Sequence, residues 1–86
     1  MEDVLHPTYL QNPTALPEIT SEKKAVEVFN IVNGSTTVFP NAFGILIYFP
    51  TSWSSREKIL VFIGHTNSGI WMSYRTDGMT KNWTKI

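Results

Sequence analysis

Few residues of this chain are of a type and spacing that could carry out catalysis. The second half has two acids, Glu57 and Asp77, and one histidine, His65. Glycoside hydrolysis needs two carboxylates held about 5–10 Å apart, and nothing in the spacing of these acids indicates such a pair. A lone histidine beside a turn is more often structural, and no nucleophile elbow, phosphate loop or metal motif occurs. The sequence predicts a protein that is not an enzyme and that uses no cofactor.

Arg75 is a better candidate for binding chemistry. It follows Tyr74, and a guanidinium beside aromatic rings can make bidentate contacts with a carboxylate or stack on a ring. The more ordinary interpretation, which we favour, is that Arg75 stacks on Trp71 or Trp83 and holds the last strand in place. Tyr74 and Arg75 are retained as candidate ligand-binding residues beside that interpretation.

Trp53 and Asn67 complete the set of candidate ligand-binding residues. Trp53 is the only aromatic residue in the polar stretch 51–57. It either folds back over the core, as tryptophan commonly does, or forms an exposed platform for a sugar ring or a partner chain. Asn67 lies in an expected turn, where its side chain would be accessible.

Two strands and a turn must position these side chains. Residues 59–63 are apolar throughout, which suits a strand buried on both faces. Residues 70–75 alternate, which places Ile70, Met72 and Tyr74 on one side and Trp71, Ser73 and Arg75 on the other. Residues 67–69 are predicted to form a three-residue hairpin loop with Gly69 in the left-handed conformation.

A second continuous apolar run covers residues 44–49. Strands buried on both faces need cover on both sides, and a short chain with little helix can hardly supply two covering layers. The sequence therefore predicts either two small sheets packed as a sandwich or one sheet face buried between chains. Oligomerisation is the expected outcome.

The remaining elements are predicted from turn signals. Asn33-Gly34 between residues 28–32 and 35–39 is a strong hairpin signal. Residues 21–26 allow at most a turn or two of helix, residues 76–79 form a turn, and residues 81–86 alternate as a short last strand. Residues 1–21 contain Pro7, Pro13 and Pro17 and are predicted to be an irregular arm that lies along a neighbouring surface.

The predicted fold class is therefore mainly β. Residues 1–21 are the irregular arm, and residues 22–86 form a small antiparallel sheet or sandwich-like domain with at most one short helix.

Composition and charge narrow the class of protein further. The chain has 86 residues and no cysteine, so neither disulfides nor thiolate metal sites are available. Its net charge is zero, divided into −3 over residues 1–43 (five acids, two lysines) and +3 over residues 44–86 (five basic residues, two acids). This balance lacks the basic stripe of a nucleic-acid reader. No stretch reaches transmembrane length, and the acidic start is unlike a signal peptide, so no membrane insertion is expected.

Residues 28–86 resemble the knob domains of phage tail fibres and R-type pyocin fibres. The likeness lies in Gly44-Ile45-Leu46-Ile47-Tyr48-Phe49, in Gly69-Ile70-Trp71-Met72-Ser73-Tyr74-Arg75, in a closing Trp83, and in Asn41 shortly before Gly44. Two features depart from the family pattern. Lys81 or Asn82 stands where the family has a first terminal tryptophan, and Pro40 precedes Asn41 instead of following it.

The resemblance implies a setting rather than a reaction. It implies a homotrimeric tail-fibre or appendage domain in the virion tail, made in the host cytoplasm, joined to other parts of the fibre, and binding host cell-surface polysaccharide. The alternative within this setting is a trimerisation or folding cap with no ligand of its own. A weaker alternative is an unrelated bacterial β domain with a similar pattern. No catalytic residue carries over from the family.

Overall fold

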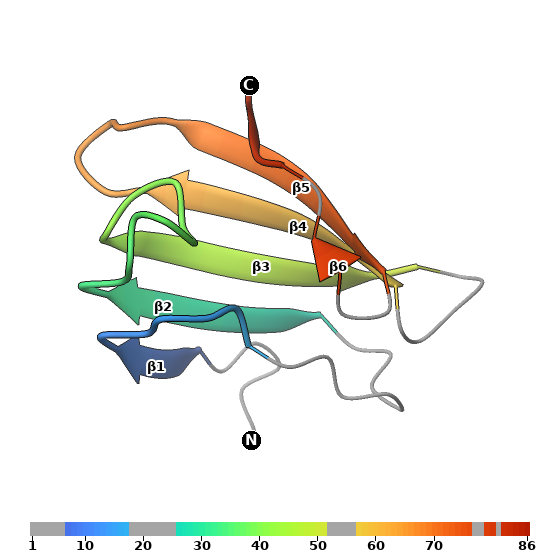
Figure 1. The fold of residues 1–86 in the computed structure, drawn as a ribbon, viewed down its shortest axis with the longest axis horizontal. Helices are drawn as coiled ribbons and strands as arrows, with labels where there is room; N and C mark the ends of the chain where they lie inside the picture. Colours follow the sequence, from blue (N-terminus) through green and yellow to red (C-terminus); the bar gives the residue numbers. More distant parts are fainter. Residues whose placement is uncertain (1–6, 18–25, 52–56, 77–78, 81) are drawn as a thin grey trace, which may run out of the picture.

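The protein folds around one twisted β-sheet, seen in a computed structural model that describes residues 7–17, 26–51, 57–76, 79–80 and 82–86. The sheet has seven strands in the order β1-β2-β3-β4-β5-β6, with β7 also paired to β5. Figure 1 shows β1 to β5 side by side in chain order, with β6 and the C-terminal segment next to β5. The strands are β1 (Thr8–Gln11), β2 (Glu27–Val32), β3 (Gly44–Pro50), β4 (Glu57–Gly64), β5 (Ile70–Thr76), β6 (Met79–Thr80) and β7 (Thr84–Lys85).

The prediction of a mainly β fold is confirmed. All strand pairs are antiparallel except β1 and β2, which are parallel, and the described residues contain no helix. These residues form a single sheet and not the two sheets of a sandwich. The helical turn expected at residues 21–26 falls, all but its last residue, outside the described part of the chain.

The N-terminal arm is not irregular throughout, contrary to the prediction. Residues 8–11 form β1, which pairs with β2 in the register Tyr9 to Asn30 and Leu10 to Ile31. Pro7 and Pro13 lie just outside this strand, at a sheet edge where their missing N–H groups leave no ladder bond unmade. The prolines therefore limit the length of β1 without preventing it.

The predicted hairpin at Asn33-Gly34 is also wrong. Asn33 does adopt a positive φ of 56°, but the next strand begins only at Gly44 and pairs directly with β2. Residues 35–39 form a turn, in which the Val38 and Phe39 N–H groups donate to Ser35 O at 3.0 and 2.9 Å. Packing explains the difference, because this turn places Phe39 over the core, where it is buried.

The β4–β5 hairpin is confirmed, but its turn is displaced from the predicted position. The left-handed residues are Thr66 (φ 54°) and Asn67 (φ 61°), and Gly69 has φ 132°. The Ser68 N–H donates to His65 O at 3.1 Å, which closes a tight turn with two positive-φ central residues. The loop is therefore residues 65–69, longer than the three residues expected.

The core lies on one side of the sheet, which we call the inner face. Its buried apolar residues are Phe29, Ile31, Leu46, Tyr48, Leu60 and Phe62, together with Phe39 from the 33–43 loop. The cover over the inner face comes from loops and chain ends. Leu16, Val38 and Trp83 pack on this cluster, and the indole N–H of Trp83 donates to Val38 O at 3.0 Å.

Neither continuous apolar run is buried on both faces within one chain. Burial alternates along β3 and β4, so Leu46, Leu60 and Phe62 are fully buried while Ile45 and Ile47 are only half-buried. The predicted sidedness of β5 is confirmed, because Ser73 and Arg75 are buried and Ile70 and Met72 are exposed. One face of the sheet is therefore covered and the other is open.

Candidate functional site

The open side of the sheet, which we call the outer face, carries three rows of mostly apolar side chains. The strand register aligns residues of β1 to β5 across the sheet, and residues opposite one another point to the same face. The first row, next to the β4–β5 loop, is Tyr9, Asn30, Ile45, Ile63 and Ile70. The second is Val28, Ile47, Val61 and Met72. The third is Phe49, Ile59 and Tyr74.

Exposed large apolar side chains concentrate on this face. The hydrogen bond from Ile86 N to Ile70 O at 2.8 Å continues the β5–β7 register and brings Ile86 beside the first row. The exposed large apolar residues of the described chain are Tyr9, Phe49, Ile59, Ile63, Ile70, Met72 and Ile86, all at outer-face positions, and Phe43 in the 33–43 loop. Single exposed apolar residues are normal on protein surfaces, whereas a contiguous group marks an interaction site.

The outer face is large enough for an interface core. At a strand spacing of about 4.8 Å, the first row is about 19 Å wide, the second about 14 Å and the third about 10 Å. At a rise of about 3.3 Å per residue, the first and third rows lie about 13 Å apart. With side chains at the margins, the patch covers on the order of 400–500 Å², in the range where patches on single chains are often functional. A standard interface uses about 800 Å² per partner, with an apolar centre and a polar rim. Polar residues at the margins of the rows, Asn30, Glu57 and Thr76, could supply part of such a rim.

The two edges of the sheet are less suited to association than the outer face. At one edge, β1 is only four residues long and lies between two prolines. At the other edge, β6 and β7 pair with the two ends of β5, and the Ser73 hydroxyl donates to Asn82 O at 3.4 Å between them. Short, covered or proline-flanked edges discourage strand addition. The outer face is therefore the main open surface among the described residues.

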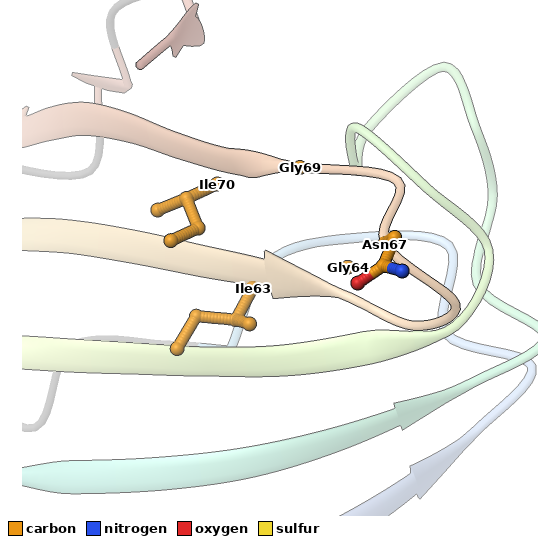
Figure 2. Close-up of a pocket in the computed structure, with 5 residues that line it drawn as sticks. All are labelled: Ile63, Gly64, Asn67, Gly69 and Ile70. Carbon is orange, nitrogen blue, oxygen red and sulfur yellow. The ribbon is translucent and has the colours of Figure 1, made fainter.

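An open depression of about 300 Å³ lies at the β4–β5 end of the outer face. Its lining residues are Ile63, Gly64, Asn67, Gly69 and Ile70. Figure 2 shows Ile63 and Ile70 projecting to the same side from adjacent strands, with Asn67 at the hairpin turn. The depression thus offers two apolar walls and one side-chain amide.

Asn67 and Tyr74, both predicted to bind a ligand, lie at opposite ends of the hairpin. Asn67 is exposed in the 65–69 loop beside the depression. Tyr74 is half-buried near the far end of β5, where its hydroxyl donates to Glu57 Oε1 at 2.7 Å. The two residues cannot contact one small ligand.

Arg75 lies in the interior instead of at the surface, with only 6% of its area exposed. Its Nη1 donates to Pro17 O at 2.5 Å and to the Tyr48 hydroxyl at 2.9 Å, and that hydroxyl donates to Pro17 O at 2.8 Å. Its cross-strand neighbour, Lys58, is fully buried as well. Arg75 therefore fastens the segment before β2 to the inner face.

The aromatic stacking favoured for Arg75 is made by another cation. Lys85 Nζ lies over the Trp71 ring, 5.4 Å from its centroid. Trp53 lies outside the described residues. Of the four predicted binding residues, Asn67 alone is exposed beside a concave surface in the part of the chain that is described.

The polar groups considered for catalysis are not assembled into a site. Glu57 is the first residue of β4 and accepts from Tyr74, whereas His65 follows the end of β4 and stacks on Phe43 with 6.4 Å between ring centroids. Asp77 lies outside the described part of the chain. Within the described ranges, no three potential metal ligands cluster and no helix is long and apolar enough to cross a membrane.

Sequence reasoning missed Tyr9 and the outer-face rows as surface features. In β3 and β4 both faces are apolar, so the alternation that marks an exposed face is hidden in the sequence. The sequence predicts an irregular arm around Tyr9, whereas the position of Tyr9 beside Asn30 depends on a parallel pairing between distant segments. One signal pointed to an open face: the chain has more apolar strand residues than its other segments can cover.

Comparison of the chain with protein-family models, curated proteins and solved structures finds no match.

Proposed function

We propose that this chain is an assembly domain of a fibre-like appendage, in which three copies associate by burying their outer faces against one another. The observation that carries the proposal is the gathering of exposed apolar side chains in aligned rows on one sheet face. Burying a large apolar side chain contributes about 1.5–3 kcal/mol. A chain of 86 residues without cysteine has no disulfide to add to its small core.

A second copy of the same chain is the partner that suits this surface. The three rows contain no charged residue. Packing these rows of identical copies together therefore brings no like charges into contact, because Glu57 lies outside the rows at their margin. Identical subunits commonly close into symmetric rings. Two β-sheet faces of aliphatic side chains can interdigitate at a separation of about 10 Å. The short and covered edges favour this face-to-face arrangement over the addition of strands.

The number of copies and the fibre setting rest on the resemblance of residues 28–86 to fibre knob domains. That resemblance favours a homotrimer in the virion tail, joined to other parts of the fibre. In this arrangement the outer faces turn toward the threefold axis, and the inner faces with their loops turn away from it. The domain would hold three chains in register, as expected of a trimerisation or folding cap.

The test is sedimentation velocity of the purified chain at micromolar concentration, with circular dichroism to follow folding. Met72 is exposed in the second row of the outer face, so Met72→Lys places a charge inside the proposed interface. Thr36 is exposed in the 33–43 loop, so Thr36→Lys adds the same charge away from the outer face. We expect the native chain and Thr36→Lys to sediment as trimers, and Met72→Lys to sediment as a folded monomer.

A stable folded monomer of the native chain across the micromolar range would overturn the proposal. If Met72→Lys still sediments as a trimer, the contact between copies does not lie on the outer face. A dimer would keep self-association but contradict the fibre setting.

Binding of host cell-surface polysaccharide is a second candidate function, supported by the exposed Asn67 beside the depression. A side-chain amide next to apolar walls can bind a sugar hydroxyl. The test is a glycan-binding screen of the native chain, followed by Asn67→Ala and Trp53→Ala, with Asn82→Ala as an exposed control. Loss of binding in the first two variants and not in the control supports this function, and no binding to any glycan in the screen contradicts it.

A further inference from the structure

We infer that Tyr9 of one copy inserts into the depression that Ile63, Asn67 and Ile70 line in the neighbouring copy. This inference rests on the proposed self-association and identifies its anchoring contact. Tyr9 is 69% exposed, and it lies on the edge strand β1 at the end of the first outer-face row. The depression lies at the opposite end of the same row, between β4 and β5.

The strand register makes these two features meet in a closed ring. When copies are related by a rotation axis parallel to the strands, each residue keeps its level along that axis. Residues of the first row then face first-row residues of the neighbouring copy. The β1 edge of one sheet meets the β5 edge of the next, so Tyr9 approaches Ile63 and Ile70. A twofold axis that is parallel to β3 and lies in front of the outer face produces the same contact, so the contact does not depend on the number of copies.

The chemistry of the depression suits a tyrosine side chain. Its volume of about 300 Å³ is at the lower limit of small-molecule pockets, which is more appropriate for one side chain than for a polysaccharide. Ile63 and Ile70 offer apolar walls for the ring, and the Asn67 amide can pair with the phenol hydroxyl. Tyrosine is enriched in interface hot spots because its rigid ring buries large area and its hydroxyl finds a polar partner.

Cysteine cross-linking tests the contact directly, because the native chain contains no cysteine. Within one chain, residues 9 and 70 lie on strands separated by three others, about 19 Å apart, which is too far for a disulfide. The double variant Tyr9→Cys, Ile70→Cys can therefore form this disulfide only between copies. The matched control is Tyr9→Cys, Phe49→Cys, since Phe49 is also exposed on the outer face but lies in the third row. Each variant is oxidised under mild conditions and resolved on a denaturing gel without reductant.

We expect the 9–70 variant to give covalent dimers and trimers, in a ladder that ends at three. The Tyr9→Cys, Phe49→Cys control and the single variants Tyr9→Cys and Ile70→Cys should give no covalent species beyond a minor dimer. If the 9–70 variant sediments as an oligomer but does not cross-link, the Tyr9 contact is wrong while the proposed assembly stands. If the native chain is monomeric, the proposed assembly itself fails and the contact fails with it.

Discussion

At the scale of single residues, the most constrained polar contacts surround Pro17 O. This carbonyl accepts from both the Tyr48 hydroxyl and Arg75 Nη1, and Tyr48 and Arg75 are both buried. A buried arginine is costly unless its donors are paired, and its Nε has no partner among the described residues. The Tyr48 hydroxyl therefore matters twice, since it accepts from the guanidinium and also anchors the segment before β2.

We predict that Tyr48→Phe lowers the free energy of unfolding by about 2–3 kcal/mol, because it leaves one guanidinium N–H buried and unpaired. Urea unfolding measures the loss. Tyr74→Phe is the matched control, since it removes a hydroxyl that donates to Glu57 from a half-buried position. The control should cost less than about 1 kcal/mol, because water can reach this site. Equal losses in the two variants would contradict the buried role of Tyr48.

At the scale of elements, the β4–β5 hairpin contains a local conflict between sequence and conformation. Thr66 has a φ of 54°, a left-handed conformation that is rare for β-branched residues. Turns of this kind favour Asn followed by Gly.

We predict that Thr66→Asn combined with Asn67→Gly raises the free energy of unfolding by about 1–2 kcal/mol, measured by urea unfolding. Thr37→Asn, in the 33–43 loop where φ is not positive, should have no such effect. A destabilised double variant would mean that the Thr66 hydroxyl, which donates to His65 O at 2.6 Å, outweighs the strain.

The C-terminal segment acts as part of the cover over the inner face. Trp83 packs edge-on against Phe62 with 6.1 Å between ring centroids, and its N–H donates to Val38 O. We predict that Trp83→Ala costs about 2–4 kcal/mol of unfolding free energy through the cavity that it leaves. Trp83→Phe keeps most of the packing and should cost about 1 kcal/mol from the lost hydrogen bond. Thermal unfolding of both variants checks the order, and a harmless Trp83→Ala would mean that the core does not need this cover.

The strands of the sheet centre were predictable from sequence because local signals and tertiary packing agree there. Residues 44–49 and 59–63 are runs of strand-forming residues, and the alternation in residues 70–75 correctly placed Arg75 on the same face as Trp71 and Ser73. The alternation shows which face a side chain points to, but it does not show how deeply that side chain is buried. We favour an Arg75 that stacks on Trp71 or Trp83, but the buried guanidinium instead donates to Pro17 O.

The errors arose where distant segments override local preference. Asn33-Gly34 carries a hairpin signal, yet burial of Phe39 makes residues 35–39 a covering turn. The prolines around β1 suggested an irregular arm, yet an edge strand tolerates them. The predicted binding residues do not form one site. Asn67 and Tyr74 lie at opposite ends of the β4–β5 hairpin, and the sequence could not show this separation.

At the scale of the whole molecule, the sheet has one covered face and one open face. The cover comes from the 33–43 loop, the segment up to Pro17 and the C-terminal segment, and all three pack on the inner face. Nothing in the described part of the chain covers the outer-face rows. A small single-layer fold of this kind derives its stability from one core only. Association through the outer face would add a second core without lengthening the chain.

The proposed association would make the stability of the chain depend on protein concentration. For a chain that folds and trimerises together, a tenfold rise in concentration adds about 0.9 kcal/mol per chain, because three chains share two association steps of about 1.4 kcal/mol each. For a domain of this size that gain should raise the unfolding temperature by about 4–7 °C. Differential scanning calorimetry over two decades of concentration measures the shift. The native chain should show it, and Met72→Lys should unfold at a lower temperature that does not change with concentration. A native unfolding temperature that is equally independent of concentration would mean that a single copy is stable with its outer face exposed to water.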